Sequence, residues 1–155
     1  MVRLNVYTLM GVGMKKIFLG ILAFCSLLFP AHSQTPNDPP GLSTFLNAVR
    51  VTETGGMPND GIGAIGDNGT SLGPYQISYA YWVDAQMPYG TWNRCLVDKA
   101  YSEEVMKRYW RRYCPNAYKN GNWEILARVH NGGPSGFRKQ ATIRYWNTVK
   151  RIMNN

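Results

Sequence analysis

Among the acidic residues, Glu53 and Asp67 form a pair that could carry out chemistry. Glu53 ends a stretch whose apolar residues recur at helical spacing, so its carboxyl group should be partly desolvated and keep its proton. Asp67 lies in a polar, glycine-rich segment and should stay hydrated and ionised. One protonated and one ionised carboxyl group can together hydrolyse a glycosidic bond, because the acid protonates the leaving oxygen and the carboxylate meets the positive charge on the sugar carbon.

Each of these carboxylates also has a purely structural interpretation. A glutamate at a helix end is often just solvated, and an aspartate in a turn commonly accepts hydrogen bonds from its own loop. Asp60 is the alternative to Asp67, although its setting in Asn59-Asp60-Gly61 is more typical of a plain hairpin turn. The choice of the second carboxylate therefore stays open between Asp67 and Asp60.

His130 stands at the end of an apolar helical stretch, directly before a glycine loop. Glycine lets a ligand approach the backbone closely, so we interpret His130 as positioning either a sugar or a catalytic carboxylate, with helix capping as the alternative. Ser71 and Gln76 could hydrogen-bond the acetamido or hydroxyl groups of a sugar, or could bond within the protein. With two cysteines and one histidine after residue 33, the chain does not offer a plausible set of metal ligands.

Helical periodicity and turn residues predict the elements that would position these groups. Helices are expected at about 42–54, from Pro74 through Trp82, at 102–113, at 122–130 and over 143–152, with hairpin strands and loops at 57–73. The cations of the segment Lys107–Arg112 are expected to form a solvated helix face. The fold class is therefore α+β, mostly helical, with a small β-hairpin region early in the domain.

The beginning of the chain is typical of a secretory signal. Met14, the expected start, is followed by two lysines, an apolar run over 17–29 and small residues around Ser33, where cleavage is expected. Pro30 breaks the run and no second apolar segment follows, so a membrane anchor is not expected and the protein should be secreted or periplasmic. The expected organisation is 1–33 extension and signal, 34–40 proline-rich leader and 41–155 catalytic domain.

The chain is basic, with 17 Lys and Arg against 9 Asp and Glu and a net charge of +8. An exported cation suits the polyanions of a cell wall, whereas nucleic acid is excluded as a partner because no helix-turn-helix, zinc or RNA-binding signature is present. Cys95 and Cys114 remain after cleavage of the signal. Two cysteines in an oxidising compartment allow one pairing, so we expect a disulfide between them.

Several motifs together resemble the invertebrate-type lysozymes, the destabilase family. The motifs are Val51-Thr-Glu53-Thr-Gly-Gly56, Gly66-Asp67-Asn-Gly-Thr-Ser-Leu-Gly-Pro-Tyr-Gln-Ile77, Ala80-Tyr-Trp82, Ala127-Arg-Val-His-Asn-Gly-Gly-Pro134 and Tyr145-Trp146-Asn147. The likeness runs from about Leu42 to Ile152, and the Ser-Leu-Gly-Pro-Tyr-Gln-Ile and His-Asn-Gly-Gly-Pro blocks are the most specific.

The resemblance implies a small lysozyme-like fold that hydrolyses the β-1,4 bond after N-acetylmuramic acid in peptidoglycan, with chitin oligosaccharides as a further substrate and no cofactor. It assigns Glu53 as general acid and Asp67 as nucleophile or stabilising carboxylate. We expect five residues to take part in substrate binding: Ser71, Tyr75, Gln76, His130 and Asn131. Taken alone, Tyr75 is more typical of a core residue than of a stacking platform for a sugar. The resemblance does not define an oligomeric state.

The chain departs from the family in having few cysteines and a slightly different interval between Glu53 and Gln76, which keeps Asp60 open. Three rival functions follow. A lytic transglycosylase would need the acid alone; an isopeptidase would use Ser71 with His130; and a non-catalytic cationic protein would only bind the wall.

Overall fold

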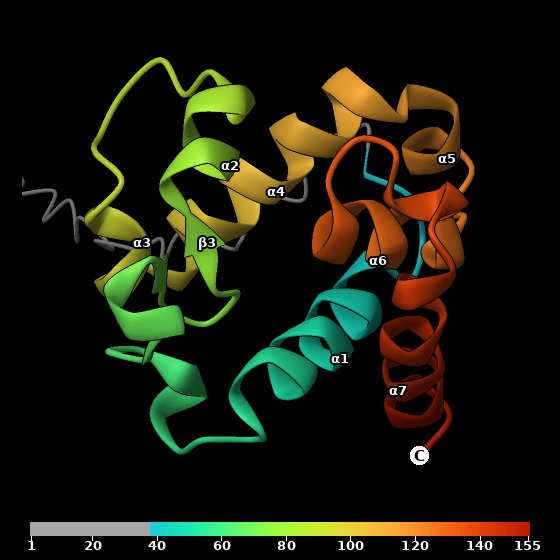
Figure 1. Cartoon of the computed structure of the whole chain (residues 1–155), viewed down its shortest axis with the longest axis horizontal. Helices are drawn as coiled ribbons and strands as arrows, with labels where there is room; N and C mark the ends of the chain where they lie inside the picture. The colour runs from blue at the N-terminus through green and yellow to red at the C-terminus, as the bar shows by residue number, and fades with distance from the viewer. Residues whose placement is uncertain (1–37) are drawn as a thin grey trace, which may run out of the picture. The chain divides into compact units, whose positions relative to one another are not determined.

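The computed structural model describes residues 38–155, which belong to one structural unit spanning 34–155 (Figure 1). The expected signal segment, its cleavage position near Ser33 and the first part of the proline-rich leader lie outside the described residues. None of the helices in the described part is long and apolar enough to cross a membrane.

Helices dominate the described chain, and they confirm a mostly helical α+β fold. The α-helices are α1 (Leu42–Thr54), α2 (Tyr79–Ala85), α3 (Arg94–Val97), α4 (Lys99–Tyr113), α5 (Pro115–Lys119), α6 (Trp123–Gly132) and α7 (Ile143–Met153). The short 3-10 helices are η1 (Asn59–Gly61), η2 (Asp67–Gly69), η3 (Gly136–Arg138) and η4 (Gln140–Thr142). The strands are β1 (Ile65–Gly66), β2 (Ser71–Leu72) and β3 (Ile77–Ser78).

The three strands form one antiparallel sheet in the order β1-β2-β3. Its register pairs Ile65 with Leu72 and Leu72 with Ile77. The hairpin expected at 57–73 is therefore confirmed, but the helix expected from Pro74 is wrong. Pro74 instead lies in a turn closed by a hydrogen bond from the Gln76 amide to the Gly73 carbonyl, at 3.1 Å, and the chain continues as β3.

Helix α2 begins only after β3, where Ser78 caps it by accepting a hydrogen bond from the Tyr81 amide at 3.2 Å. The remaining predicted helices are confirmed, with ends that differ by a few residues. Helix α6 begins after Asn122, whose side chain accepts from the Ile125 amide, and α4 begins at Lys99 rather than Ser102.

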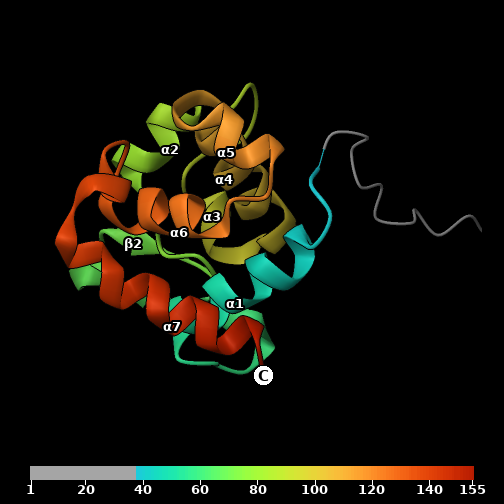
Figure 2. The ribbon, with the colours of Figure 1, turned by 90° about the vertical axis from the view of Figure 1, so that its right-hand side faces the viewer.

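The core joins α1, α4 and α6. Phe45 and Val49 from α1 are fully buried, as are Trp110 from α4 and Leu126 from α6. The indole of Trp110 donates to the Leu126 carbonyl at 3.0 Å, so its one polar atom is satisfied inside the core. Burial of each such side chain stabilises the fold by about 1.5–3 kcal/mol. The views in Figures 1 and 2 show α1 and α7 lying alongside one another, so this core also supports α7.

The basic residues of α4 do not form the solvated face that the sequence predicts. Arg108 donates to the carbonyls of Ala85 and Gln86, at 3.1 and 2.8 Å, and Arg112 donates to the carbonyl of Asp84 at 2.9 Å. These carbonyls lie at the carboxyl end of α2, where no following turn of the helix supplies amide donors for them. The two arginines therefore cap α2 and join it to α4.

Lys107 and Arg111 also have a partner, because both form ion pairs with Asp38, at 2.6 and 3.1 Å. The Tyr118 hydroxyl donates to the same carboxylate, whose side chain is only 4% exposed. Residue 38 was expected to lie in the leader that precedes the domain. In the structure this end of the leader is bound to α4 and α5.

The expected disulfide is wrong, because Cys95 and Cys114 are both free thiols. Cys95 lies next to the start of α4, where the Ser102 hydroxyl donates to the Cys95 carbonyl at 3.0 Å. Cys114 follows the end of α4, 12 residues after Ser102, which corresponds to a rise of about 18 Å along the helix. A disulfide needs Cα atoms within about 7 Å, so these thiols cannot meet. Burial raises the pKa of Cys95 to about 11 and that of Cys114 to about 12.

Candidate active site

Glu53 lies in the last turn of α1, and its side chain is 17% exposed. Gly55, with φ of 64°, ends the helix one residue after Thr54. The Tyr145 hydroxyl from α7 donates to Glu53 Oε1 at 2.6 Å. The packing of α1 against α7 therefore fixes the carboxyl group in a half-buried position that solvent can still reach.

His130 forms the second contact with the same oxygen. Its Nε2 lies 3.2 Å from Glu53 Oε1, and its Nδ1 lies 3.3 Å from the Tyr81 hydroxyl. We assign the neutral Nε2–H tautomer, because Tyr81 can then donate to Nδ1 while Nε2 donates to Glu53. The ring of Tyr81 is itself held by stacking on Tyr109, with 3.7 Å between centroids.

The two tyrosines of this network stay protonated donors. Burial raises the pKa of Tyr145 well above its ordinary value of 10.0, and the adjacent Glu53 carboxylate raises it further. Burial likewise raises the pKa of Tyr81 well above 10.0, with a smaller contribution from Tyr109. Neither hydroxyl loses its proton in the neutral range, so both hydrogen bonds persist there.

The contacts leave the two oxygens of Glu53 unequal. Oε1 accepts from Tyr145 and His130, whereas no hydrogen bond or ion pair within residues 38–155 engages Oε2. A proton carried on Oε2 could therefore be transferred without breaking the contacts that hold the side chain. This arrangement suits a general acid.

Asp67 lies in η2, the turn between β1 and β2, and is exposed. Its Oδ2 accepts a hydrogen bond from the Ser71 hydroxyl at 2.8 Å, and its carbonyl accepts from the Thr70 hydroxyl at 2.9 Å. Its φ of 47° places a non-glycine residue in the left-handed region, which costs energy and is common at functional sites. Within the described residues no hydrogen bond or ion pair joins Asp67 to Glu53.

Gln76 adds a second strained position to the sheet, with φ of 48°. Its side-chain Nε2 donates to the Gly73 carbonyl at 2.9 Å, and its Oε1 occupies the space beside Gly66. A Cβ atom on Gly66 would lie 1.9 Å from that oxygen, so residue 66 has to be glycine while Gln76 keeps this position. Gln76 thus bonds within the protein, which was one of its two interpretations.

The other residues predicted to bind substrate do not share one set of contacts in the structure. Tyr75 is fully buried and its hydroxyl donates to Glu103 at 2.8 Å, which favours its core interpretation over contact with a substrate. Asn131 is exposed on α6. Ser71 is buried and bonds Asp67, whereas His130 bonds Glu53 and Tyr81, so no contact within residues 38–155 supports a Ser71–His130 pair.

Asp60, the alternative second carboxylate, forms ion pairs with Lys99 at 2.8 Å and with Arg50 at 3.4 Å. The hydrogen bond and charge of Lys99, with the charge of Arg50, hold the pKa of Asp60 below its ordinary value of 3.8. The carboxylate thus joins α1, η1 and α4 through cations. This environment is that of a structural ion pair.

Tyr145 and Tyr81 are the residues that sequence reasoning missed. The sequence indicates Tyr145 only as part of the Tyr145-Trp146-Asn147 motif, without a link to Glu53, which lies 92 residues earlier. Its place in that motif was the signal that could have identified it. As for metals, no group of three or more His, Cys, Asp or Glu side chains within residues 38–155 is arranged to hold an ion.

Comparison with known proteins places this arrangement in a family. A sequence model of the destabilase family matches residues 59–152. The chain is 37% identical over 106 residues to Lysozyme 1 of Crassostrea virginica, a match that covers 68% of this chain and 56% of that protein. It is 34% identical to Invertebrate-type lysozyme 6 of Caenorhabditis elegans, over 61% of this chain and 72% of the relative.

The fold agrees with the same family. The crystal structure of Tapes japonica lysozyme superimposes with a TM-score of 0.60 at 34% identity, covering 70% of this chain and 88% of that one. The chain spans little more than half the length of the Crassostrea relative. Because the family model covers most of the described residues and the lysozyme structure shares the fold, the chain belongs to the destabilase family of invertebrate-type lysozymes.

Proposed function

We propose that the protein is a lysozyme that hydrolyses the β-1,4 bond between N-acetylmuramic acid and N-acetylglucosamine in peptidoglycan. The observation that carries the proposal is the half-buried Glu53, which is held through one oxygen by Tyr145 and His130. The lysozyme names of the relatives support the reaction class. Chitin oligosaccharides, which share the β-1,4 linkage and the acetamido group, are the second substrate.

In the proposed mechanism Glu53 transfers the proton on Oε2 to the glycosidic oxygen as the bond breaks. The carboxylate that forms is stabilised by the donors from Tyr145 and His130, which already point at Oε1. Asp67, whose Oδ2 is held by the Ser71 hydroxyl, presents Oδ1 to the anomeric carbon as nucleophile or stabilising anion. Glu53 then deprotonates the water that completes hydrolysis.

The proposal includes export. The basic and apolar segment before residue 30 is typical of a secretory signal with cleavage near Ser33. The mass of intact secreted protein would test this, because a chain that still begins at Met1 or Met14 would contradict it.

The test of the function is the substitution Glu53→Gln. The amide keeps the shape of the side chain but cannot donate the proton, so clearing of a peptidoglycan suspension should slow by about 100-fold or more. Binding of a chitin oligosaccharide should persist. Glu124→Gln is the matched control, since Glu124 is an exposed glutamate paired with Arg128 at 2.8 Å, and it should keep full activity.

Product analysis separates hydrolysis from its nearest rival. Mass spectrometry of the released muropeptides should find reducing ends. Anhydro ends would identify a lytic transglycosylase, and substantial hydrolysis by folded Glu53→Gln protein would refute the role of Glu53.

A further inference from the structure

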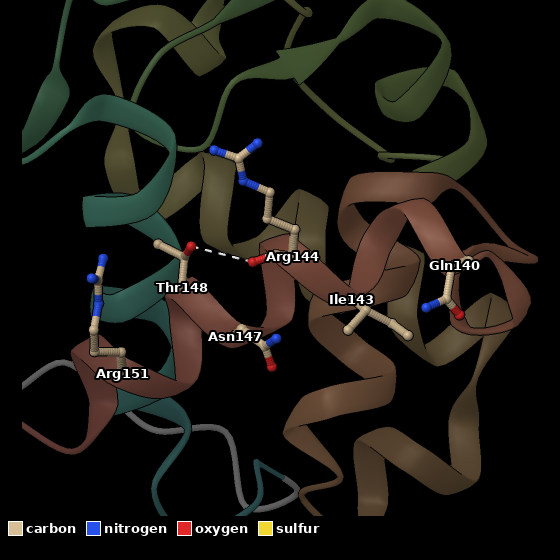
Figure 3. Close-up of a pocket in the computed structure, with 6 residues that line it drawn as sticks. All are labelled: Gln140, Ile143, Arg144, Asn147, Thr148 and Arg151. Carbon is tan, nitrogen blue, oxygen red and sulfur yellow. Dashed lines mark hydrogen bonds between the residues drawn. The ribbon is translucent and has the colours of Figure 1, made fainter.

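Helix α7 carries a groove that none of the contacts of Glu53 or Asp67 uses. The groove has a volume of about 680 Å³ (Figure 3). It is lined by Gln140, Ile143, Arg144, Asn147, Thr148 and Arg151. Tyr145, the α7 residue that bonds Glu53, is not among them, so the groove is distinct from the candidate active site.

Two arginines give the groove its charge. Arg144 and Arg151 are seven residues apart, which is two helical turns or about 10 Å. Figure 3 shows both side chains extending to the same side of α7, with Thr148 between them. Both residues are exposed, and within residues 38–155 neither guanidinium has a hydrogen bond or an ion pair. Arg128 differs in this respect, because Glu124 pairs with it.

No acidic residue lies nearby in the sequence to balance this charge. Residues 125–155 contain six Lys and Arg and no Asp or Glu. Unpaired guanidinium groups on a surface without acids attract anions, and each one can form two parallel hydrogen bonds to a phosphate or carboxylate.

We propose that this groove binds a phosphodiester polymer of the bacterial wall, of the teichoic acid type. The two guanidinium groups, about 10 Å apart along one helix face, suit a ligand that carries anionic groups at intervals along one chain. The side-chain amide of Asn147 and the Thr148 hydroxyl, between the arginines, and the Gln140 amide at the other side of Arg144 can bond the hydroxyl groups of a polyol or sugar (Figure 3). Ile143 is the one apolar side chain among the lining residues.

The polarity of α7 favours such a polymer over a lipid bilayer. A helix that inserts into a membrane surface presents large apolar side chains beside its cations. The exposed large apolar side chains of the described residues all lie before residue 98, and none is on α7. The groove would hold the protein on the wall while Glu53 acts elsewhere on the molecule, but binding does not depend on the proposed hydrolysis.

The experiment compares two double variants with the same change in net charge. Arg144→Gln/Arg151→Gln removes the groove charges, whereas Lys119→Gln/Arg138→Gln removes two exposed cations that do not line the groove. Binding of purified wall teichoic acid is measured by calorimetry at several salt concentrations. The groove variant should bind about tenfold more weakly than the parent protein. The control variant should bind like the parent, and the parent's affinity should fall as salt is added.

Each outcome decides between alternatives. Equal weakening in both variants would overturn the groove in favour of net charge alone, and the absence of saturable binding would overturn the site. Tighter binding to anionic phospholipid vesicles, lost in the same groove variant, would replace the polymer by a membrane surface. Hydrolysis of a soluble chitin oligosaccharide, measured in parallel, should be equal in all three proteins, so a failure of the proposed function would be seen separately.

Discussion

In the proposed mechanism, the hydroxyl of Tyr145 determines which oxygen of Glu53 donates the proton, because it occupies Oε1 at 2.6 Å. Tyr145→Phe removes only that hydroxyl and keeps the ring in place. We expect kcat to fall about tenfold while KM stays nearly constant, since the loss of one charge-assisted hydrogen bond, about 1.5 kcal/mol, affects the reacting state rather than the bound substrate. Steady-state kinetics on a chitin oligosaccharide would measure the split.

The control for this substitution is Tyr89→Phe, which removes the hydroxyl of an exposed tyrosine in the loop between α2 and α3. It should leave both kinetic constants unchanged. A rise in KM with unchanged kcat in Tyr145→Phe would instead indicate that Tyr145 contacts the substrate.

Single substitutions can also decide which aspartate is the second catalytic carboxylate. Asp67→Asn should lose activity about as fully as Glu53→Gln, because an amide can neither attack nor stabilise the sugar cation. Asp60→Asn should keep most of its activity, since Asp60 is engaged by ion pairs with Lys99 and Arg50. Rates of peptidoglycan clearing for the folded variants would decide. The opposite pattern would move the second carboxylate to Asp60.

At the level of elements, the start of α4 depends on Asp98. Its Oδ1 accepts a hydrogen bond from the Tyr101 amide at 2.9 Å, and this bond, with Arg94, holds the pKa of Asp98 below its ordinary value of 3.8. Asp98→Ala should lower the free energy of unfolding by about 1 kcal/mol near neutral pH. A lowered pKa stabilises the fold above about pH 3.8 and ceases to do so as the pH falls through the lower folded value.

Denaturant titrations of the parent protein and of Asp98→Ala at pH 7 and at about pH 3 would measure this. The difference in free energy of unfolding between the two proteins should be smaller at about pH 3. Asp98→Asn is the matched control. It keeps an acceptor for Tyr101 without the charge, so it should retain most of the stability and lose the pH dependence. An equal effect of Asp98→Ala at both pH values would contradict the electrostatic part of this explanation.

The elements that could be predicted are those whose signals are local. The apolar spacing over 42–54 and the capping side chain of Asn122 define α1 and the start of α6 without help from the rest of the chain. The helix predicted from Pro74 is wrong because proline is equally suited to the first turn of a helix and to a tight turn. The pairing of Leu72 with Ile77 in the sheet decides between them, and the helical spacing of the apolar residues after Pro74 does not reveal that pairing.

The site was predictable to a similar degree. Glu53, Asp67 and His130 could be selected by residue type and motif, and the structure joins two of them directly, at 3.2 Å. The partners of these residues could not be selected, because the contact from Tyr145 to Glu53 crosses 92 residues. The cations of α4 were misjudged for the same reason, since Arg108 finds its acceptors 22 and 23 residues earlier in the chain.

For the molecule as a whole, free thiols predict that stability does not depend on redox conditions. Cys95 and Cys114 are unpaired and lie at opposite ends of α4. The denaturation midpoint should therefore be the same with and without a thiol reductant. A disulfide between these residues would stabilise the fold by on the order of 3 kcal/mol, so a clear drop on reduction would show that the bond had formed after all.

The contact between Gly66 and Gln76 makes the two positions depend on each other as the sequence changes. A side chain at 66 collides with the Gln76 carboxamide, and Gln76 itself has a backbone conformation that glycine adopts more readily. Replacement of Gly66 alone forces the Gln76 carboxamide to move and strains its hydrogen bond to the Gly73 carbonyl, so it should destabilise the fold. The same replacement should destabilise the fold less in a background that already carries glycine at 76. A library randomised at both positions and selected for folding would test this. Substitutions at 66 should be recovered mainly in sequences that also carry a smaller residue at 76, which would make the two positions epistatic.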